Sequence, residues 1–409
     1  MNIVTHTYLH LLRCAIYGEA CSESSFATWL DAEWYALEQL ALRQGTAALV
    51  YDVLLQGNTE RIPADLLLRM KSLCAGQMMR RPGQVSLLKK TMDALHAGGV
   101  HSVLLKGFGL ATLYPRPELR SWGDVDIYVG KEQYHEGARL LRDAFPESKH
   151  HDEEWEALKH YCLIVQGGVI EMHRVGIKLE HPRDIRIYDP LEEAAMRPSN
   201  TEQLYIPETA IRFAVPEGMF NMLYTFMHAW EHFVVEGVGM KQLADVCLLA
   251  RKEYLRRADN AEEMRTYHDY LMRAVRALRL QQPWQLIGYV CVSCLGLPAE
   301  MWQGYWLGAE GSKSQQRWLR THGDRFVERV MAEGIARETQ YEEGEDRYTE
   351  REKALRMPIV LRKLKTLRSK TRLANMIAPY SPQYARHVVA TACWKGLRRL
   401  IHKEETVLY

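Results

Sequence analysis

Apolar residues in the first hundred positions recur every three or four residues, which is the period of an α-helix. This spacing holds over residues 24–56 and again over residues 66–95. Gly98 and Gly99 then supply a typical helix stop. We therefore expect residues 1–98 to form a helical lead-in.

The pattern changes after this point, because short apolar runs begin to alternate with helical segments. Runs typical of buried strands stand at 100–105, 124–129, 161–166 and 169–174. Gly167 and Gly168 separate the last two runs and predict a hairpin. Residues 108–114 and 131–144 have helical spacing between the strands. The succession indicates an α+β fold with a small mixed sheet.

The helical period returns after Asp189 and Pro190. It marks four segments, at 213–231, 240–256, 261–279 and 284–295. Residues 338–352 are acidic and poor in apolar side chains, which is typical of a solvated linker. We divide the chain into a helical lead-in (1–98), an α/β core (99–190), a helical domain (191–335), an acidic linker (336–355) and basic amphipathic C-terminal helices (356–409).

The composition describes a folded protein, with 47% hydrophobic and 25% charged residues. The N-terminal residues do not have the pattern of a signal peptide, and the chain has no apolar stretch of about 18 residues, so we expect a cytoplasmic protein without a spanning helix. Cys291 and Cys294 form a CxxC motif without a second ligand pair at zinc spacing. Helix packing is the favoured interpretation of that motif, and we expect the cysteines to be free thiols.

The formal charge of +2 conceals a strong asymmetry. Residues 356–403 contain twelve Lys or Arg and no Asp or Glu, so they carry +12 and the rest of the chain carries −10. Basic amphipathic helices suit an anionic membrane surface, nucleic acid or an acidic patch of the same protein. Packing against the acidic remainder is the favoured interpretation, with peripheral membrane contact as the alternative. A nucleic-acid partner is disfavoured because the region around the candidate site is not basic.

The candidate chemistry lies in two of the predicted strands. In a strand, residues two apart face the same way, so Asp124 and Asp126 present adjacent carboxylates while Val125 and Ile127 enter the core. Like charges at this distance repel unless a cation lies between them. Glu171, on a later strand, is the third candidate. Three carboxylates from adjacent strands provide what a two-magnesium site for displacement at phosphorus needs.

Basic residues precede these acids. Lys106 and Gly107, at the end of the first predicted strand, supply a cation and a backbone that can approach a phosphate closely. Arg120 and Arg116 are candidates to neutralise triphosphate oxygens or to pair with Glu118.

Histidines form two further candidates. His173 lies two residues after Glu171 and returns to the same face of the strand. His228 and His232 share a helical face, where packing beside Trp230 is favoured over metal or substrate contact.

These motifs carry a family resemblance. A strand ending in Gly, a D-x-D between hydrophobic residues and a single acid on a later strand resemble the DNA polymerase β-type nucleotidyltransferase superfamily. The elements L-K-G, L-Y and R-x-x-G-D-x-D within LLKGFGLATLYPRPELRSWGDVDIYV are more closely similar to a bacterial uncharacterised nucleotidyltransferase family, often associated with polysaccharide-biosynthesis or peptide-modification gene clusters. ALRQGTAALVYDVLL and GVGMKQLADVCLLA resemble that family as well. Gly107-Phe108 departs from the Gly-Gly or Gly-Ser usual in the superfamily.

The resemblance implies a nucleotidyltransferase core on the mixed sheet and an enzyme that transfers a nucleoside monophosphate from an NTP to a hydroxyl acceptor, releasing pyrophosphate. It also implies that Asp124, Asp126 and Glu171 are catalytic and hold Mg²⁺, as two ions, with the acceptor a sugar, small molecule, peptide or protein. The alternative is a non-catalytic nucleotide-binding or scaffold protein, placed at a membrane through its basic tail.

Overall fold

The computed structural model describes residues 2–21, 26, 28–121, 123–150, 160–209, 211–235, 237–308, 311–335, 370–371 and 373–391. Its fold is α+β, as predicted: the chain is mostly helical, with a five-stranded mixed sheet and a two-stranded sheet. The predicted acidic linker, 336–355, lies outside the described residues, as does much of the basic segment 356–409.

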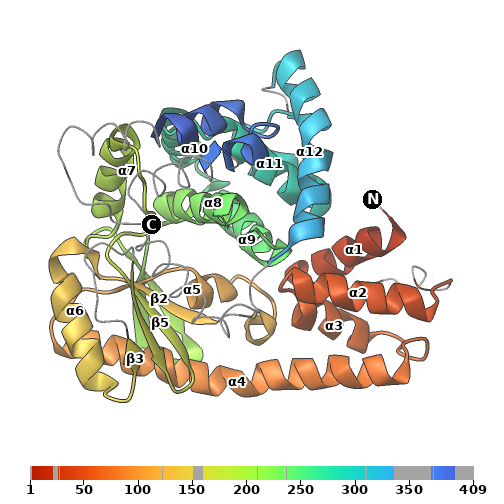
Figure 1. The fold of residues 1–409 in the computed structure, drawn as a ribbon, viewed down its shortest axis with the longest axis horizontal. Coiled ribbons are helices and arrows are strands. Elements are labelled where there is room, and N and C mark those ends of the chain that lie inside the picture. Colours follow the sequence, from red (N-terminus) through yellow and green to blue (C-terminus); the bar gives the residue numbers. More distant parts are fainter. Residues whose placement is uncertain are drawn as a thin grey trace, which may run out of the picture.

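The helical lead-in is confirmed and consists of α1 (Ile3–Tyr17), α2 (Asp31–Arg43), α3 (Ala47–Gln56) and α4 (Ala64–Ala97). The continuous period over 24–56 is divided between α2 and α3 by a turn at Gly45, whose positive φ of 67° suits a residue without a side chain. Helix α4 is 34 residues long and runs beneath both the other lead-in helices and the sheet (Figure 1).

The main sheet has the order β1-β2-β5-β4-β3. Its strands are β1 (Val103–Leu104), β2 (Asp124–Tyr128), β3 (Lys149–His150), β4 (His160–Val165) and β5 (Gly168–His173). Strands β2 and β5 are parallel, and the other neighbours are antiparallel. The β4–β5 hairpin is confirmed, with positive φ at Gly167 and Gly168. Of the first predicted strand, 100–105, the structure forms a strand only at Val103 and Leu104.

One face of this sheet is apolar. Val125, Ile127, Ile170 and Met172 are buried there in a hydrophobic cluster with residues of α4 and α6 (Gly130–Ala144). Two helices therefore cover the apolar face, and the opposite face is left to carry the polar side chains.

The structure corrects the prediction between 182 and 217. A helix, α7 (Pro182–Ala195), continues through Pro190, so the boundary placed at residue 190 falls inside a helix. The helix predicted over 213–231 is wrong at its start, because 213–215 belong to β7 (Ile211–Val215), which pairs with β6 (Glu202–Ile206). Phe213 is fully buried in the sheet-side cluster, so tertiary packing outweighs the helical spacing there.

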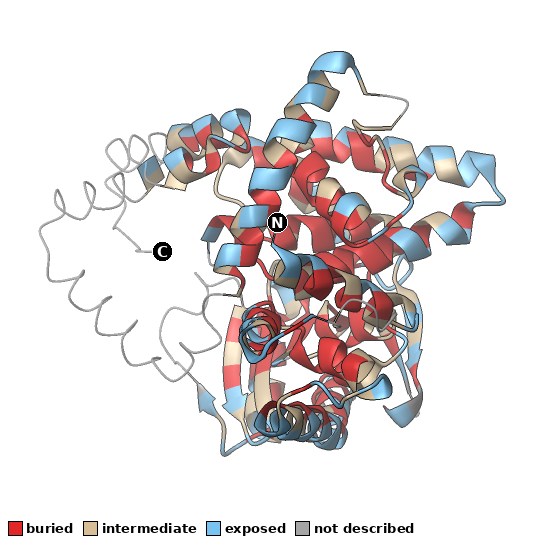
Figure 2. Cartoon of the chain, turned by 90° about the vertical axis from the view of Figure 1, so that its right-hand side faces the viewer, coloured by how far each residue is buried: buried red, intermediate tan, exposed pale blue. Residues whose placement is uncertain are grey.

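The helical second half is otherwise confirmed. Its helices are α8 (Gly218–Val235), α9 (Met240–Arg257), α10 (Ala261–Ala277), α11 (Gln281–Tyr289) and α12 (Lys313–Glu333). Buried residues run through the middle of these helices (Figure 2), and Tyr380 from the late segment 373–391 packs on Phe233 and Phe326, with ring centroids 5.6 and 5.9 Å apart. Cys291 and Cys294 are buried in the same core, as the packing interpretation expected.

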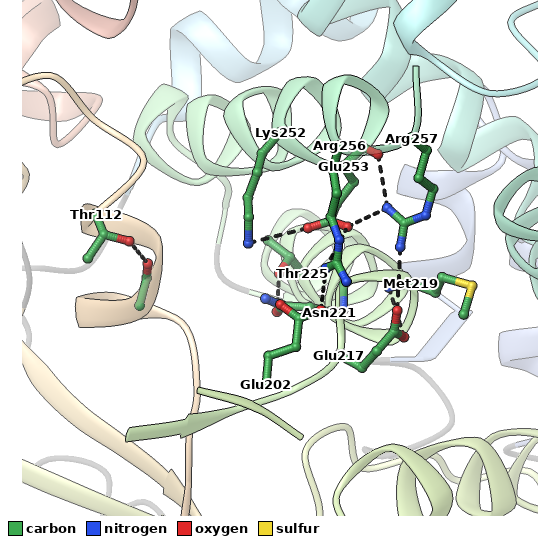
Figure 3. Close-up of polar contacts among 12 residues, drawn as sticks. Thr112, Glu202, Glu217, Met219, Asn221, Thr225, Lys252, Glu253, Arg256 and Arg257 are labelled. Carbon is green, nitrogen blue, oxygen red and sulfur yellow. Dashed lines mark hydrogen bonds and ion pairs between the residues drawn. The ribbon is translucent and has the colours of Figure 1, made fainter. Parts of the chain in front are cut away.

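Charged side chains of α9 lie against the N-terminus of α8, where Arg257 Nη2 is 3.4 Å from Oε1 of Glu217 (Figure 3). Glu253 is fully buried, and its Oε2 accepts a 2.6 Å hydrogen bond from Arg257 Nη1. A Cβ placed on Gly218 would lie 2.0 Å from the same Oε2. The close approach of the two helices thus depends on a glycine and on a carboxylate that is paired.

Within the described residues, no helix combines the length and the apolar character needed to cross a membrane. In the described part of the basic segment, Lys370 lies 3.5 Å from Glu180, and His387 pairs with Asp184. This part of the segment packs back on acidic residues of the chain, as the favoured interpretation expected.

Candidate active site

The polar face of the main sheet gathers acids from two parallel strands. Alternation along β2 directs Asp124 and Asp126 to this face, opposite Val125 and Ile127. The register places Asp126 directly beside Glu171 on β5. One oxygen from each of the three carboxylates lies within 4.8 Å of the others. The structure therefore brings together the three acids singled out from the sequence.

These acids are partly or wholly shielded from solvent. Asp126 is 3% exposed, Glu171 is buried and Asp124 is half-buried. The charge of Asp126, followed by burial, raises the pKa of Asp124. Burial also opposes ionisation of Asp126, but Lys106 and His173 outweigh it and hold the pKa of Asp126 below its usual value. The repulsion within the group is thus partly relieved by Lys106 and His173 at Asp126, and by Lys106 and Lys241 at Asp124.

Lys106 supplies an ammonium group beside these acids. Its Nζ lies 2.8 Å from Oδ1 of Asp126, and the side chain is mostly buried. The backbone of Lys106 has φ 46° and ψ −130°, in the region that favours glycine. Such strain persists only where the surroundings enforce it, and it is found preferentially at functional sites. The conformation turns the chain from β1 into α5 (Gly107–Ala111) while directing the lysine to the acids.

Two histidines border the acids. His173, expected on this face, has Nε2 2.8 Å from Asp126 Oδ1 and 3.7 Å from Glu171 Oε2. His160 was missed from the sequence, and its Nε2 lies 3.5 Å from Glu171 Oε1. The hairpin register pairs His160 with His173, so the predicted β4–β5 hairpin contained the signal that could have found it.

Helix α8 adds a residue for which packing had been favoured. His228 Nε2 lies 2.9 Å from Lys106 Nζ, and the rings of His228 and His232 have centroids 4.4 Å apart. The helical half of the chain therefore reaches the polar face of the sheet. The spacing of the two histidines identified their shared face, but it could not show what that face contacts.

The two arginines lie in other clusters. Both terminal nitrogens and Nε of Arg120 are engaged, with Asp245 of α9 and with the carbonyl of Ser121, and Tyr114 donates to the same aspartate. Arg116 pairs with Asp52 and Glu118, the latter being the alternative given from the sequence. Arg120 is 5% exposed, which makes it part of the packing between α9 and the connection into β2.

Gly107 lies next to the acids through its backbone. A Cβ added to it would lie 3.6 Å from the carbonyl oxygen of Asp124, an ordinary contact. A methyl group at this position would meet the backbone of the first acid without a clash, and no positive φ requires the glycine.

The donor set determines which ion the acids suit. Three carboxylates offer hard oxygen ligands of the kind that Mg²⁺ prefers, usually together with substrate phosphates. Lys106 lies beside this set, with His228 in contact with its ammonium group, and an ammonium group can donate to phosphate oxygens. The arrangement suits binding and reaction of a polyphosphate.

Comparison with known proteins supports this chemistry. A family model described as "Uncharacterised nucleotidyltransferase" matches residues 31–296, which is more than half of the chain. The matched range includes the sheet, the three acids and α8. No curated protein matches the chain.

Proposed function

The chain belongs to this uncharacterised nucleotidyltransferase family, and from that membership we propose that it is a Mg²⁺-dependent enzyme that transfers a nucleoside monophosphate from an NTP to a hydroxyl acceptor. The acceptor oxygen forms a bond to the α-phosphorus, the bond from the α-phosphorus to the bridging oxygen breaks, and pyrophosphate leaves. The observation that carries the proposal is the meeting of Asp124, Asp126 and Glu171 within 4.8 Å on one face of the sheet.

Each acid has a role in this proposal. Asp124 and Asp126 would hold two Mg²⁺ ions, and Glu171 would complete the site of the catalytic ion. When bound, the ions would neutralise phosphate charge and support an in-line displacement. Glu171 also helps to accept the proton of the attacking hydroxyl. His173 of β5, within hydrogen-bond distance of Asp126 on β2, orients that acid.

Lys106 and His228 face the same site from two different elements. Lys106 holds a charge near the position of the phosphates, and His228 fixes its ammonium group through a 2.9 Å contact. The backbone at Gly107 would approach the triphosphate. We assign Arg120 to positioning, because its pair with Asp245 holds the chain that leads into β2.

The proposal identifies the sheet and its flanking helices as the nucleotidyltransferase core, with residues 99–190 as its centre and α8 completing the site. A cytoplasmic location suits an enzyme that consumes NTPs. The acceptor is a sugar, a small molecule, a peptide or a protein.

The test is incubation of the purified chain with each α-labelled NTP and Mg²⁺, with and without candidate acceptors. We expect Mg²⁺-dependent pyrophosphate release and a mass gain of one nucleotide on the acceptor. Release of phosphate in place of pyrophosphate would contradict the reaction. NTP binding by calorimetry without turnover for any acceptor class would favour the non-catalytic alternative.

A further inference from the structure

A group of soft metal donors lies at the C-terminal end of α1. His10 and Cys14 are four residues apart and share one face of the helix. The helix ends at Gly18, which has φ 71°, and the N–H of Glu19 bonds back to the carbonyl of Cys14 at 2.9 Å. This reversal carries the chain back across the helix end and brings Cys21 beside Cys14.

The distances suit a single ion. Nε2 of His10 lies 3.9 Å from Sγ of Cys14, and the donor atoms of His10, Cys14 and Cys21 all lie within 4.8 Å of one another. Tetrahedral zinc, with Zn–S of about 2.3 Å and Zn–N of about 2.0–2.1 Å, separates its ligand atoms by about 3.5–3.8 Å. Small side-chain rotations are enough to close the difference.

We propose that His10, Cys14 and Cys21 bind a thiophilic divalent metal, with Zn²⁺ as the ion that fits best. Two thiolates and one imidazole form a donor set that selects zinc over magnesium. On binding, the two thiol protons pass to solvent and the thiolates balance the charge of the ion. Water occupies the fourth position, since His10 and Cys21 are only partly buried.

The surroundings of Cys14 and Cys21 suit a bound metal ion better than a pair of reactive, redox-active thiols. The last carbonyl groups of α1 place partial negative charge at this end of the helix. Burial raises the pKa of both thiols, that of Cys21 to about 11, so neither is a reactive thiolate while no metal is bound. Coordination to a divalent ion deprotonates such thiols directly.

This site is separate from the carboxylate site. It lies before residue 31, where the family match begins, and it uses soft donors where the sheet uses oxygens. Its consequence is structural, because the turn that it would fix packs on the connection leading to β2: a Cβ on Gly18 would lie 3.3 Å from Pro115. The proposal therefore stands independently of nucleotidyl transfer.

The test is titration of the reduced full-length protein with Co²⁺, a spectroscopic substitute for Zn²⁺. An Asp124→Asn/Asp126→Asn background removes the carboxylate site. We expect one equivalent of Co²⁺ with a thiolate-to-cobalt charge-transfer band, displaced by Zn²⁺, and a Zn²⁺-dependent rise in Tm. The band should be lost in Cys14→Ser, Cys21→Ser and His10→Gln.

Matched controls lie close by. His6→Gln changes an exposed histidine one turn earlier on the same helix, and Cys74→Ser changes a buried thiol that, like Cys14, donates to a backbone carbonyl. Both should retain the band. If Cys14→Ser does not fold, the less buried Cys21 and His10 variants decide the question. Persistence of the band in Cys21→Ser, cobalt binding without charge transfer, or oxidation of the two thiols to a disulfide without metal uptake would overturn the proposal.

Discussion

The ammonium group of Lys106 lies 2.9 Å from Nε2 of His228 and joins the turn after β1 to helix α8. An ammonium group only donates, so Nε2 of His228 must accept and the ring proton resides on Nδ1. Burial favours the neutral amine, but Asp126 and the other acidic groups around it hold the pKa of Lys106 well above its usual value. The acids thus keep the lysine charged, and the charged lysine in turn fixes the tautomer of the histidine.

Removing this acceptor should impair transfer. His228→Ala leaves Lys106 held by Asp126 alone, and we expect kcat/KM for the NTP to fall about 10- to 100-fold. Steady-state kinetics on the purified variant measure the effect. His135→Gln, at an exposed position of α6, is the matched control and should leave kcat/KM unchanged. Equal activity in the two variants would remove His228 from the site.

Asp126 should be the acid on which nucleotidyl transfer depends most. Asp126→Asn keeps the shape of the side chain but removes the charge, and we expect transfer to fall by at least about 100-fold, since bound metal contributes several kcal/mol to such transition states. Labelled-nucleotide transfer at saturating Mg²⁺ is the measurement. Asp143→Asn, at an exposed position of α6, supplies the control. Undiminished transfer by Asp126→Asn would refute the site.

The ion pair between Arg120 and Asp245 should contribute to the free energy of unfolding. Arg120→Met leaves Asp245 as a buried, uncompensated carboxylate, which typically costs about 3–5 kcal/mol. Arg139→Met breaks two exposed ion pairs on α6 and should change stability far less than Arg120→Met does. Urea unfolding of both variants gives the comparison. A raised KM for the NTP in a stable Arg120→Met protein would instead favour the phosphate contact expected from the sequence.

The helix start at Gly218 should not tolerate a methyl group. Gly218→Ala places a Cβ against the buried carboxylate of Glu253, and we expect a loss of about 1–3 kcal/mol from overpacking. Gly83→Ala, at an exposed position of α4, has no atom within 4 Å of the new Cβ and should gain up to about 1 kcal/mol in helix propensity. Thermal or chemical unfolding separates the two. We expect Gly218→Ala to lower the free energy of unfolding and Gly83→Ala to raise it. Equal effects of the two substitutions would show that α8 can move away from α9.

A buried carboxyl in α7 should make stability depend on pH. Burial raises the pKa of Glu192 to about 7, although the N–H of Gly176 donates to its Oε2 at 2.9 Å. The folded protein therefore keeps a proton that the unfolded chain releases, and the stability that this adds is full below the usual pKa and lost as the pH rises through 7. The slope should approach about 1.4 kcal/mol per pH unit within that window.

Glu192→Gln removes this titration while keeping an acceptor for Gly176. Its free energy of unfolding should vary less than that of the parent between about pH 4.5 and 7, the window set by the two pKa values. Glu193→Gln changes the neighbouring, more exposed carboxyl and should keep the parental pH profile. Identical profiles for both variants would mean that Glu192 titrates normally.

The sequence predicted those features of the fold that depend on the spacing of apolar residues within one segment. The hairpin and the placing of Asp124 and Asp126 opposite Val125 follow from alternation, and alternation is a property of neighbouring residues. The β6–β7 hairpin was missed because residues 213–215 continue the helical spacing of α8, and only burial of Phe213 against the sheet decides their conformation.

Contacts between distant elements could not be predicted from these periods. Arg120 meets Asp245 across 125 residues, and Lys106 meets His228 across 122. Both contacts depend on where α8 and α9 pack against the sheet, which is set by the core as a whole. The sequence pattern therefore located the acids better than it located the basic residues around them.

The packing of Tyr380 on Phe233 has a consequence for synthesis of the chain. A ribosome releases the N-terminal helices, the sheet and α8 well before it releases residues 373–391. Domains generally fold as their residues emerge, but the aromatic cluster beside Phe233 lacks Tyr380 until residues 373–391 are made. During synthesis, His228 therefore lies on a helix whose aromatic packing is completed only when these later residues emerge.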